Sequence, residues 1–403
     1  MSNWKYPILL LGGIGISNIG GWVYLIALNL VILNETGSPF AVAILYILIP
    51  LATMCSNFWS GSVIDRVNTR KLMISLDVFR GLCIALIPII PSLPLVYFVA
   101  FIINMGTSIF EPASMVYMTK LIPKKDRQRF NALRSVINSC GALIGPVIAG
   151  GIFWLGTPHT AIYVNALAMF CSAIIICFLP NVEAHQIKGQ DFNFNVIRKD
   201  IKVILDYSRK HLFVTKVYLF FCGTTIFMSA IDSLEASFAK GALLLSDTSY
   251  GLLLSLFGLG IIAGSIMNTV WASRFKINYL ITFGTIFTAL GYLIFYSSQG
   301  FVTAVCGVVL IGFSVTFANT GYLTFYQNHI PVTIMGRFAS FFNIIEAIFI
   351  ICLTILIGFL ADIIAIRSVG LGSSICFLIL GMVVMVSVSK SNRNYFFNMS
   401  DLH

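Results

Sequence analysis

Twelve runs of apolar residues, each about 20 residues long or longer, dominate this sequence. A helix needs about 20 consecutive apolar residues to cross a bilayer. The runs do not alternate apolar and polar positions, so they predict helices rather than the strands of a membrane barrel. Charged residues make up only 10% of the 403 residues, whereas soluble domains average about 25%. We therefore predict an all-α integral membrane protein. The predicted spans are 8–33, 40–63, 72–90, 95–119, 133–155, 160–179, 212–238, 250–272, 278–297, 301–327, 338–361 and 368–389.

The basic residues predict which side of the membrane each loop faces. If successive spans alternate in direction, 22 of the 25 Lys and Arg residues lie on the side of the N-terminus. Lys240 and Arg367 lie on the other side, and Arg80 lies within the third span. Short loops rich in Lys and Arg stay in the cytoplasm. Both ends of the chain are therefore predicted to be cytoplasmic, and the net charge of +10 indicates orientation rather than nucleic-acid binding.

Several kinds of protein are excluded by what the sequence lacks. The first apolar run continues to Leu33, too long for a signal peptide, and favours a first transmembrane helix. The nine cysteines occur singly and are expected to pack as small apolar side chains, without disulfides or a metal site. The chain has no GxxxxGK[ST] loop for ATP and no HExxH or GxSxG motif. We expect no cofactor and no enzyme activity.

The longest loop divides the predicted spans six and six. We predict an N-terminal half at 1–180, a cytoplasmic linker at 181–211, a C-terminal half at 212–390 and a cytoplasmic tail at 391–403. Within the linker, residues 196–210 place apolar side chains on one helical face, surrounded by basic residues. Two interpretations stay open: a helix lying on the cytoplasmic membrane surface, or a plain tether whose charge sets orientation.

Two loops match each other at an offset of 208 residues. The loop LIPKKDRQRFNA after span four and the loop HIPVTIMGRFAS after span ten share an IP pair, at Ile122 and Ile330, and an RF pair, at Arg129 and Arg337. Two arginines after spans two and eight follow the same offset. Two six-helix halves related by a repeat are typical of transporters whose substrate path lies near the membrane midplane.

The loop after the second span reads GSVIDRVNTRKLM, residues 61–73. It resembles the cytoplasmic signature loop of the major facilitator superfamily, although Asn68 replaces the usual glycine. In that family the loop latches the outward-open state through charge contacts with neighbouring helix ends, a role that suits an acid and several bases. The resemblance implies a cytoplasmic gate, which two charged residues of span three extend. The implied gate residues are Gly61, Asp65, Arg66, Arg70, Lys71, Asp77 and Arg80.

The fifth span contains GALIGPVIAGG, residues 141–151. It resembles a motif associated in the same superfamily with exporters that exchange substrate for ions, with Ala149 in place of a glycine. Small residues four apart also permit ordinary close packing of membrane helices, and this alternative stays open. Gly260 and Gly264 of span eight are a candidate partner face. The residues that match the motif are Gly141, Gly145, Pro146 and Gly150.

Shorter sequences resemble one branch of the superfamily, the bacterial macrolide, multidrug and siderophore exporters. They are FEPA at 110–113, the sequence YQNHIPVTIMGRF that begins at residue 326, and GFLAD at 358–362. Many proton-driven drug exporters of the superfamily also carry an arginine within span four. This chain has none, which argues against proton coupling by the usual route.

Four carboxyl groups are predicted to lie within the bilayer: Glu111 in span four, Asp232 and Glu235 in span seven, and Glu346 in span eleven. A charge at a helix centre costs about 2.5–3.5 kcal/mol on insertion scales. No Lys or Arg is predicted at a similar depth, and Lys240 is the nearest candidate partner for Glu235. A carboxyl buried without a cation takes up a proton more readily than one in water. The four are therefore candidates for proton coupling or substrate recognition, with structural roles as the alternative.

Amides and aromatic rings scattered through the central spans indicate a weakly charged cavity that suits amphipathic molecules. Packing or lipid contact is the alternative role for the rings. The candidate residues are Asn18, Trp22, Asn29, Asn104, Asn319, Tyr322 and Asn343.

Together, the residues and the resemblance predict a secondary active transporter of a bacterial cytoplasmic membrane. We expect a monomer in a lipid bilayer that exports amphipathic small molecules or drugs by alternating access, with a proton gradient as energy source. Nucleic acid and metal are not expected as partners. Two alternatives remain: an exporter with one narrow siderophore or metabolite substrate, and a lipid or solute facilitator without proton coupling.

Overall fold

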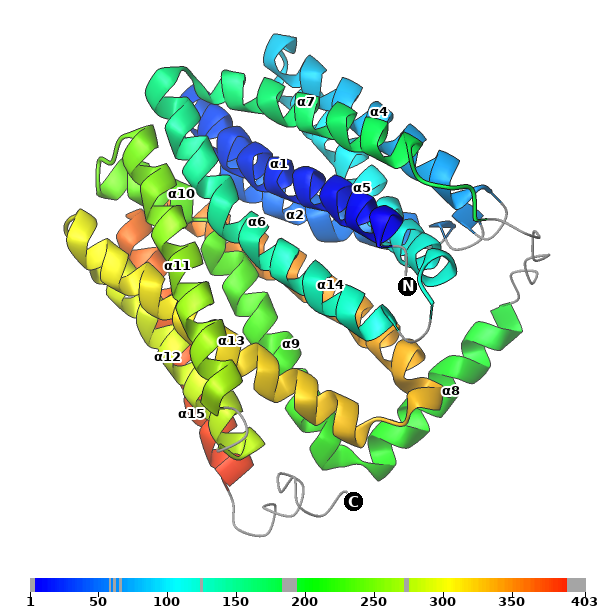
Figure 1. Ribbon diagram of the computed structural model, residues 1–403. Coiled ribbons are helices and arrows are strands. Elements are labelled where there is room, and N and C mark those ends of the chain that lie inside the picture. The colour runs from blue at the N-terminus through cyan, green and yellow to red at the C-terminus, as the bar shows by residue number, and fades with distance from the viewer. Residues whose placement is uncertain are drawn as a thin grey trace. The chain divides into compact units, whose positions relative to one another are not determined.

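The computed structural model of the protein describes residues 4–57, 59–60, 63–64, 67–123, 126–182, 194–271 and 275–389. These residues form helices joined by short connections, and no strand occurs among them (Figure 1). Within these ranges, eleven helices are long and apolar enough to cross a membrane, and Cys140–Leu155 is a shorter apolar helical segment. The prediction of an all-α membrane protein is confirmed.

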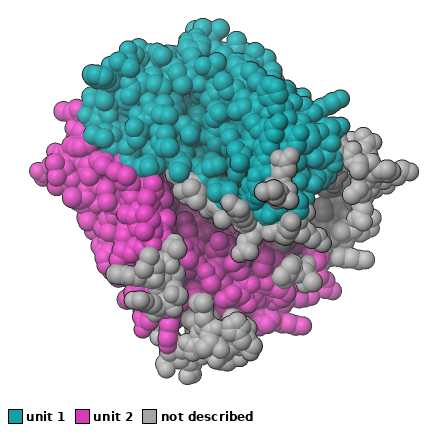
Figure 2. Space-filling view, viewed as in Figure 1, with its two compact units in different colours: residues 1–191, 246–255 teal, residues 192–245, 256–403 magenta. Residues whose placement is uncertain are grey.

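The chain divides into two compact units, which Figure 2 shows in different colours. Unit 1 comprises Met1–Asp191 and Ser246–Ser255, and unit 2 comprises Phe192–Leu245 and Leu256–His403. The short segment 246–255 covers the beginning of one helix, α11, whose remainder belongs to unit 2.

In unit 1, α1 packs against α6 and α7, α4 packs against α5 and α7, and α2 packs against α5. Helix α7 begins at a capping box, in which Thr157 and Thr160 bind each other's backbone N–H groups. Asn68 caps α4 in a similar way, because its side chain accepts a hydrogen bond from the backbone N–H of Lys71 at 2.9 Å. The helices are α1 (Lys5–Thr36), α2 (Pro39–Asn57), α4 (Thr69–Leu86), η1 (Ile87–Ile89), α5 (Leu93–Leu121), α6 (Arg127–Leu155) and α7 (Pro158–Cys177).

In unit 2, α9 packs against α14 and α15, and α12 packs against α13 and α15. The order of packing in unit 1, α6–α1–α7–α4–α5, thus recurs as α14–α9–α15–α12–α13. An internal repeat of six helices predicts this recurrence. The helices are α8 (Phe194–Lys210), α9 (Leu212–Asp232), α10 (Glu235–Ser237), η3 (Phe238–Ala242), α11 (Asp247–Trp271), α12 (Ile277–Ser297), α13 (Phe301–His329), α14 (Val332–Ile363) and α15 (Ile366–Ser389).

The isoleucines and phenylalanines that match at the 208-residue offset have the same environment in both units. Ile122 and Ile330 are each 2% exposed, and Phe130 and Phe338 are fully buried. Each isoleucine and phenylalanine belongs to an apolar cluster of its own unit. The shared sequence therefore reflects a shared way of packing the turn between two helices against the core.

The linker segment forms a helix, α8, and this helix packs against α14. Ile204 is 2% exposed and belongs to the apolar cluster of unit 2, while Ile201 and Leu205 remain exposed. Tyr207 donates a hydrogen bond to the carbonyl of His329 at 2.7 Å. The segment is thus a packed helix rather than a plain tether.

The predicted seventh span is interrupted rather than continuous. Helix α9 ends at Asp232, the short α10 begins at Glu235, and a π-helix, η3, follows. At the break, Ser233 donates its hydroxyl to the carbonyl of Ala230 at 2.6 Å, which competes with the regular helical hydrogen bonds. The two acids of this span therefore lie at a helix break. Short π-helical segments within helices are frequent at functional sites.

Candidate transport site

Two opposite charges are buried on one face of α4. Asp77 is fully buried and Arg80 is 3% exposed, and their spacing of three residues brings them together as an ion pair. Gly106 of α5 faces the arginine: a Cβ there would lie 3.0 Å from Cγ of Arg80. The glycine thus leaves room for the arginine side chain between the two helices.

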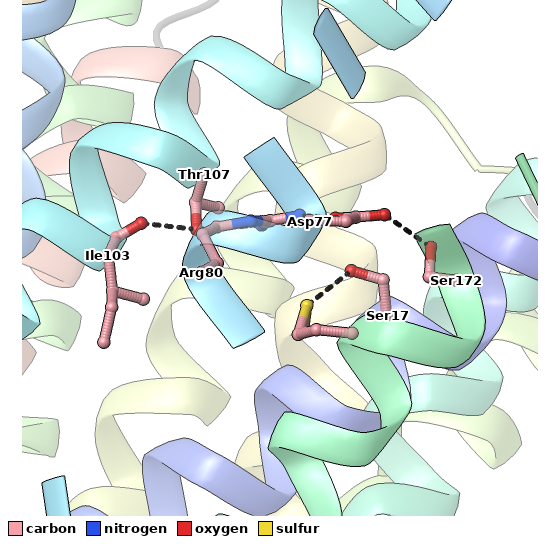
Figure 3. Close-up of polar contacts among 7 residues, drawn as sticks. Ser17, Asp77, Arg80, Ile103, Thr107 and Ser172 are labelled. Atoms are coloured by element: carbon pink, nitrogen blue, oxygen red, sulfur yellow. Dashed lines mark hydrogen bonds and ion pairs between the residues drawn. The ribbon is translucent and has the colours of Figure 1, made fainter. Parts of the chain in front are cut away.

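The ion pair joins three helices (Figure 3). Ser172 of α7 donates to Oδ2 of Asp77 at 2.7 Å, and Arg80 donates to the Thr107 hydroxyl of α5 at 3.1 Å. The guanidinium carbon lies 4.7 Å from the centre of the Phe110 ring, a cation–π distance. The pair therefore acts as a fixed polar centre inside unit 1, at the side of a cavity.

This cavity has a volume of about 320 Å³ and is lined by α1, α2, α4, α5 and α7, all of unit 1. Aromatic and aliphatic side chains such as Trp22, Phe110 and Met169 share its wall with hydroxyl, amide and charged groups. A wall of this mixed kind suits an amphipathic molecule. The polar lining residues are Ser17, Asn18, Tyr24, Arg80, Asn104, Thr107, Glu111 and Asn165.

Several buried polar atoms of the cavity wall have no hydrogen-bond partner among the described residues. They include both amide atoms of Asn165, Oδ1 of Asn18, the Tyr24 hydroxyl and Nε of Arg80. Asn165 is fully buried. An unsatisfied buried polar group costs about 1–3 kcal/mol, and such groups are uncommon in native interiors. The wall of this cavity therefore carries hydrogen-bonding groups that the described residues do not use.

Glu111 lies at this cavity and is paired, contrary to the prediction. Nη2 of Arg134 lies 2.7 Å from Oε2 of Glu111, with the arginine 11% and the acid 61% exposed. Helix α6 begins at Arg127, six residues before the predicted start of the fifth span, so Arg134 is two turns into a helix. The expectation that no basic group lies near this acid is wrong.

The acids of unit 2 have different partners. Tyr292 donates its hydroxyl to Asp232 at 2.5 Å, and Glu346 is partly buried. Oε1 of Glu235 is buried and has no hydrogen-bond partner within the described chain. Asp232 thus meets a neutral group that can both donate and accept hydrogen bonds.

The predicted gate loop is described in part. Arg70 donates from Nε to the carbonyl of Ile176 at 3.3 Å and from Nη2 to the carbonyl of Cys177, so it binds the C-terminal end of α7. A cation at this end of a helix is favoured by the helix dipole. Lys71 lies in the capped first turn of α4. Gly61, Asp65 and Arg66 lie outside the described residues.

Asp77 and Arg80, which we assigned to the same gate, have their described contacts with α5 and α7 beside the cavity. These contacts suit a part in the cavity wall, and the assignment to the gate stays a prediction.

The glycines of the fifth-span motif pack closely on α1. A Cβ on Gly141 would overlap the amide of Asn18, and one on Gly145 would lie 2.5 Å from Cβ of Trp22. The motif therefore sets the position of two cavity residues. Pro146 directly follows Gly145, inside α6.

The partner predicted for this motif in span eight is wrong. Gly260 and Gly264 pack instead against the backbone of α13 at Val309 and Phe313. Further along α6, Gly150 meets Gly251 of α11: a Cβ on Gly251 would lie 2.6 Å from Cα of Gly150. The spacing of small residues thus identified α11 correctly as the partner helix but selected the wrong glycines of it. Gly251 faces α6, whereas Gly260 and Gly264 face α13.

The structure brings together three of the predicted cavity residues, Asn18, Trp22 and Asn104. Asn29 instead donates to the Tyr46 hydroxyl at 3.2 Å and does not line the described cavity. In unit 2, Asn319 and Asn343 are exposed, and Tyr322 is buried in the apolar cluster.

Asn165 and Tyr24 also line the cavity and were not among the predicted residues. Asn165 is an amide within an apolar run, so the criterion that selected the other asparagines would also have found it.

Curated relatives of this chain include transporters from bacteria. Its match to YfiS of Bacillus subtilis, an uncharacterized MFS-type transporter, is 27% identical and covers 44% of this chain and 43% of that relative. BacE of Bacillus subtilis, named as a bacilysin exporter, is 24% identical over 73% of each chain. Macrolide efflux protein A of Streptococcus pyogenes is 23% identical over 64% of this chain and 68% of that protein. The predicted resemblance to macrolide exporters is thus confirmed.

The fold is shared with solved transporters. The structure of the nucleoside transporter NupG matches with a TM-score of 0.75 and 14% identity, over 96% of this chain and all of that one. The sequence profile of the Major Facilitator Superfamily matches residues 10–352. The chain therefore belongs to the Major Facilitator Superfamily and is a membrane transporter rather than an enzyme.

Proposed function

We propose that this transporter exports amphipathic small molecules from a bacterial cytoplasm in exchange for protons, by alternating access with both chain ends cytoplasmic. The observation that carries the proposal is the cavity of unit 1. Its wall combines Trp22 and Phe110 with amide and hydroxyl groups, which suits a substrate that has an apolar body and a polar end.

Proton exchange is assigned to the acids of unit 2. Asp232 is held by a tyrosine hydroxyl rather than by an arginine, and Glu346 is partly buried. A hydroxyl can donate to the ionised carboxyl and accept from the protonated one, so the contact survives either state. Glu111 is a weaker candidate, since protonation would break its pair with Arg134.

The direction of transport is proposed from the names of the relatives and from the fifth-span motif. One relative is named as a bacilysin exporter and another as a macrolide efflux protein, and the fifth-span motif resembles that of exporters in the superfamily. The relative named for bacilysin favours the second candidate function, an exporter with one narrow substrate.

Everted membrane vesicles test this proposal. They are energised to an acid interior and loaded with a pH-sensitive dye, and amphipathic drugs and siderophores are added one at a time. Proton release triggered by particular compounds, lost in Glu346→Gln and retained in the matched Glu111→Gln, is expected. Release with one compound alone would select the narrow exporter. No change in dye signal with any compound, although folded protein is present, would contradict proton-coupled export and favour a facilitator.

A further inference from the structure

The charged groups at the unit 1 cavity are already paired. Among the described residues that line it, the charged side chains are Arg80 and Glu111. Arg80 is paired with Asp77 and keeps one unpartnered N–H group, at Nε, within the described residues, and Glu111 is paired with Arg134. A charged group of a substrate would therefore lose its water without gaining a counterion that is not already paired, which is unfavourable.

The same wall offers neutral hydrogen-bonding groups that are not used within the described protein. Both Nδ2 and Oδ1 of Asn165 are buried and unpartnered, as are Oδ1 of Asn18 and the hydroxyl of Tyr24. An amide supplies two donors and an acceptor, and a phenol supplies one of each. These groups complement a hydroxyl or amide rather than an ion.

The position of Asn165 is built into the packing of α7 on α1. A Cβ on Gly20 would lie 2.4 Å from Oδ1 of Asn165 and 3.0 Å from Cβ of Ala168. The glycine therefore admits the amide to a fully buried site beside the cavity, where a larger residue would clash with it. Fixed polar groups of this kind discriminate strongly against a ligand that leaves them unpaired.

We propose that this cavity selects substrates whose polar end is uncharged, a hydroxyl or an amide, and that Asn165 is a specificity-determining residue that binds this end. The apolar body of the substrate lies against Trp22 and Phe110. This inference rests on the proposed function, because it specifies the substrate class of the same site.

Three dansyl probes with the same rings and different charge test the selection. They are dansylamide, which is neutral, dansylglycine, which is anionic, and a dansyl ethyltrimethylammonium, which is cationic. Binding to the purified full-length protein is followed by energy transfer from tryptophan to the dansyl group. Dansylamide is expected to bind about tenfold more tightly than either ion, the factor that corresponds to one or two hydrogen bonds. Transfer that decreases in Trp22→Phe locates the probe at the cavity.

Substitutions then test Asn165. Asn165→Leu, which keeps the size and removes the polar atoms, is expected to weaken dansylamide about tenfold and to remove the preference over the ions. The matched control is Asn29→Leu, a buried amide of unit 1 with an unpartnered Oδ1 that does not line the described cavity. This control is expected to leave the preference unchanged.

The possible outcomes separate this inference from the proposed function. Equal or tighter binding of a charged probe to the unaltered protein overturns the proposed selection for an uncharged end. This result does not depend on whether the variants fold. Retained preference in Asn165→Leu, or transfer that is undiminished in Trp22→Phe, also overturns the proposed selection. Binding needs no proton gradient, so a neutral preference together with a flat vesicle trace would support the substrate class and reject proton-coupled export.

Discussion

The two units bind their acids differently. In unit 1, Asp77 and Glu111 are each bound by an arginine, whereas in unit 2 Asp232 is bound by a tyrosine hydroxyl. An ion pair fixes both charge and position, because protonation would break it. A hydroxyl lets the acid change its charge while the contact persists. We propose from this difference that unit 1 recognises substrate and unit 2 exchanges protons.

Breaking the ion pair of unit 1 is expected to have the largest effect. Arg80→Met leaves the fully buried Asp77 without its counterion, which should cost about 3–5 kcal/mol. Thermal unfolding in detergent measures the loss. The double variant Arg80→Met with Asp77→Leu should recover most of it, since an apolar pair can replace a buried ion pair. No recovery in the double variant would mean that Arg80 contributes through its other contacts.

Removing the acids of unit 2 should instead separate energy coupling from stability. In Asp232→Asn or Glu235→Gln, transport driven by a proton gradient is expected to be abolished, while downhill movement of the same compound persists. Reconstituted vesicles with and without a pH gradient measure both. If these variants lose downhill movement as well, the acids serve substrate binding or gating. The assignment of substrate recognition to unit 1 and proton exchange to unit 2 would then be wrong.

Two hydroxyl groups allow a finer comparison, because each donates to an acid of its own unit. Ser172 donates to Asp77 at 2.7 Å and Tyr292 donates to Asp232 at 2.5 Å. Ser172→Ala should cost about 1.5–3 kcal/mol, the range for hydrogen bonds to charged groups. Tyr292→Phe should reduce proton-driven transport more than Ser172→Ala does at equal amounts of folded protein. Melting temperature and transport rate are measured for both variants. A larger loss of transport in Ser172→Ala than in Tyr292→Phe would contradict this prediction.

The smallest effects are expected at two equivalent helix starts. Asn68 caps α4 through its side chain, whereas Lys276 precedes α12 without a side-chain cap. Asn68→Ala should cost about 1 kcal/mol and Asn68→Gly only a few tenths, while Lys276→Asn should gain about 1 kcal/mol. Thermal unfolding of the three variants checks these signs. Destabilisation by Lys276→Asn would show that the lysine has another role in that turn.

Much of the fold could be predicted from the sequence, because membrane helices depend on long apolar runs. The repeat was also visible: Phe130 and Phe338 match in sequence and are both fully buried. The break in span seven could not be predicted, because a serine is compatible with a continuous membrane helix. Only the structure shows that the hydroxyl of Ser233 binds the carbonyl of Ala230.

The candidate site was only partly predictable. Acids and amides within apolar runs are conspicuous, so Glu111 and Asn18 were identified. Their partners come from tertiary packing, which no spacing along the chain reveals. Arg134 reaches Glu111 from a different helix, and Asn165 fits beside the cavity because Gly20 of another helix leaves room.

The central claim is that binding in unit 1 is coupled to a proton carried by an acid of unit 2. Its most direct test is the proton release of the purified full-length protein in weakly buffered detergent when a transported compound is added. Proton release is expected in the unaltered protein, and it should be lost in Glu346→Gln and kept in Glu111→Gln. Binding without any release, or release lost in Glu111→Gln and kept in Glu346→Gln, would contradict it.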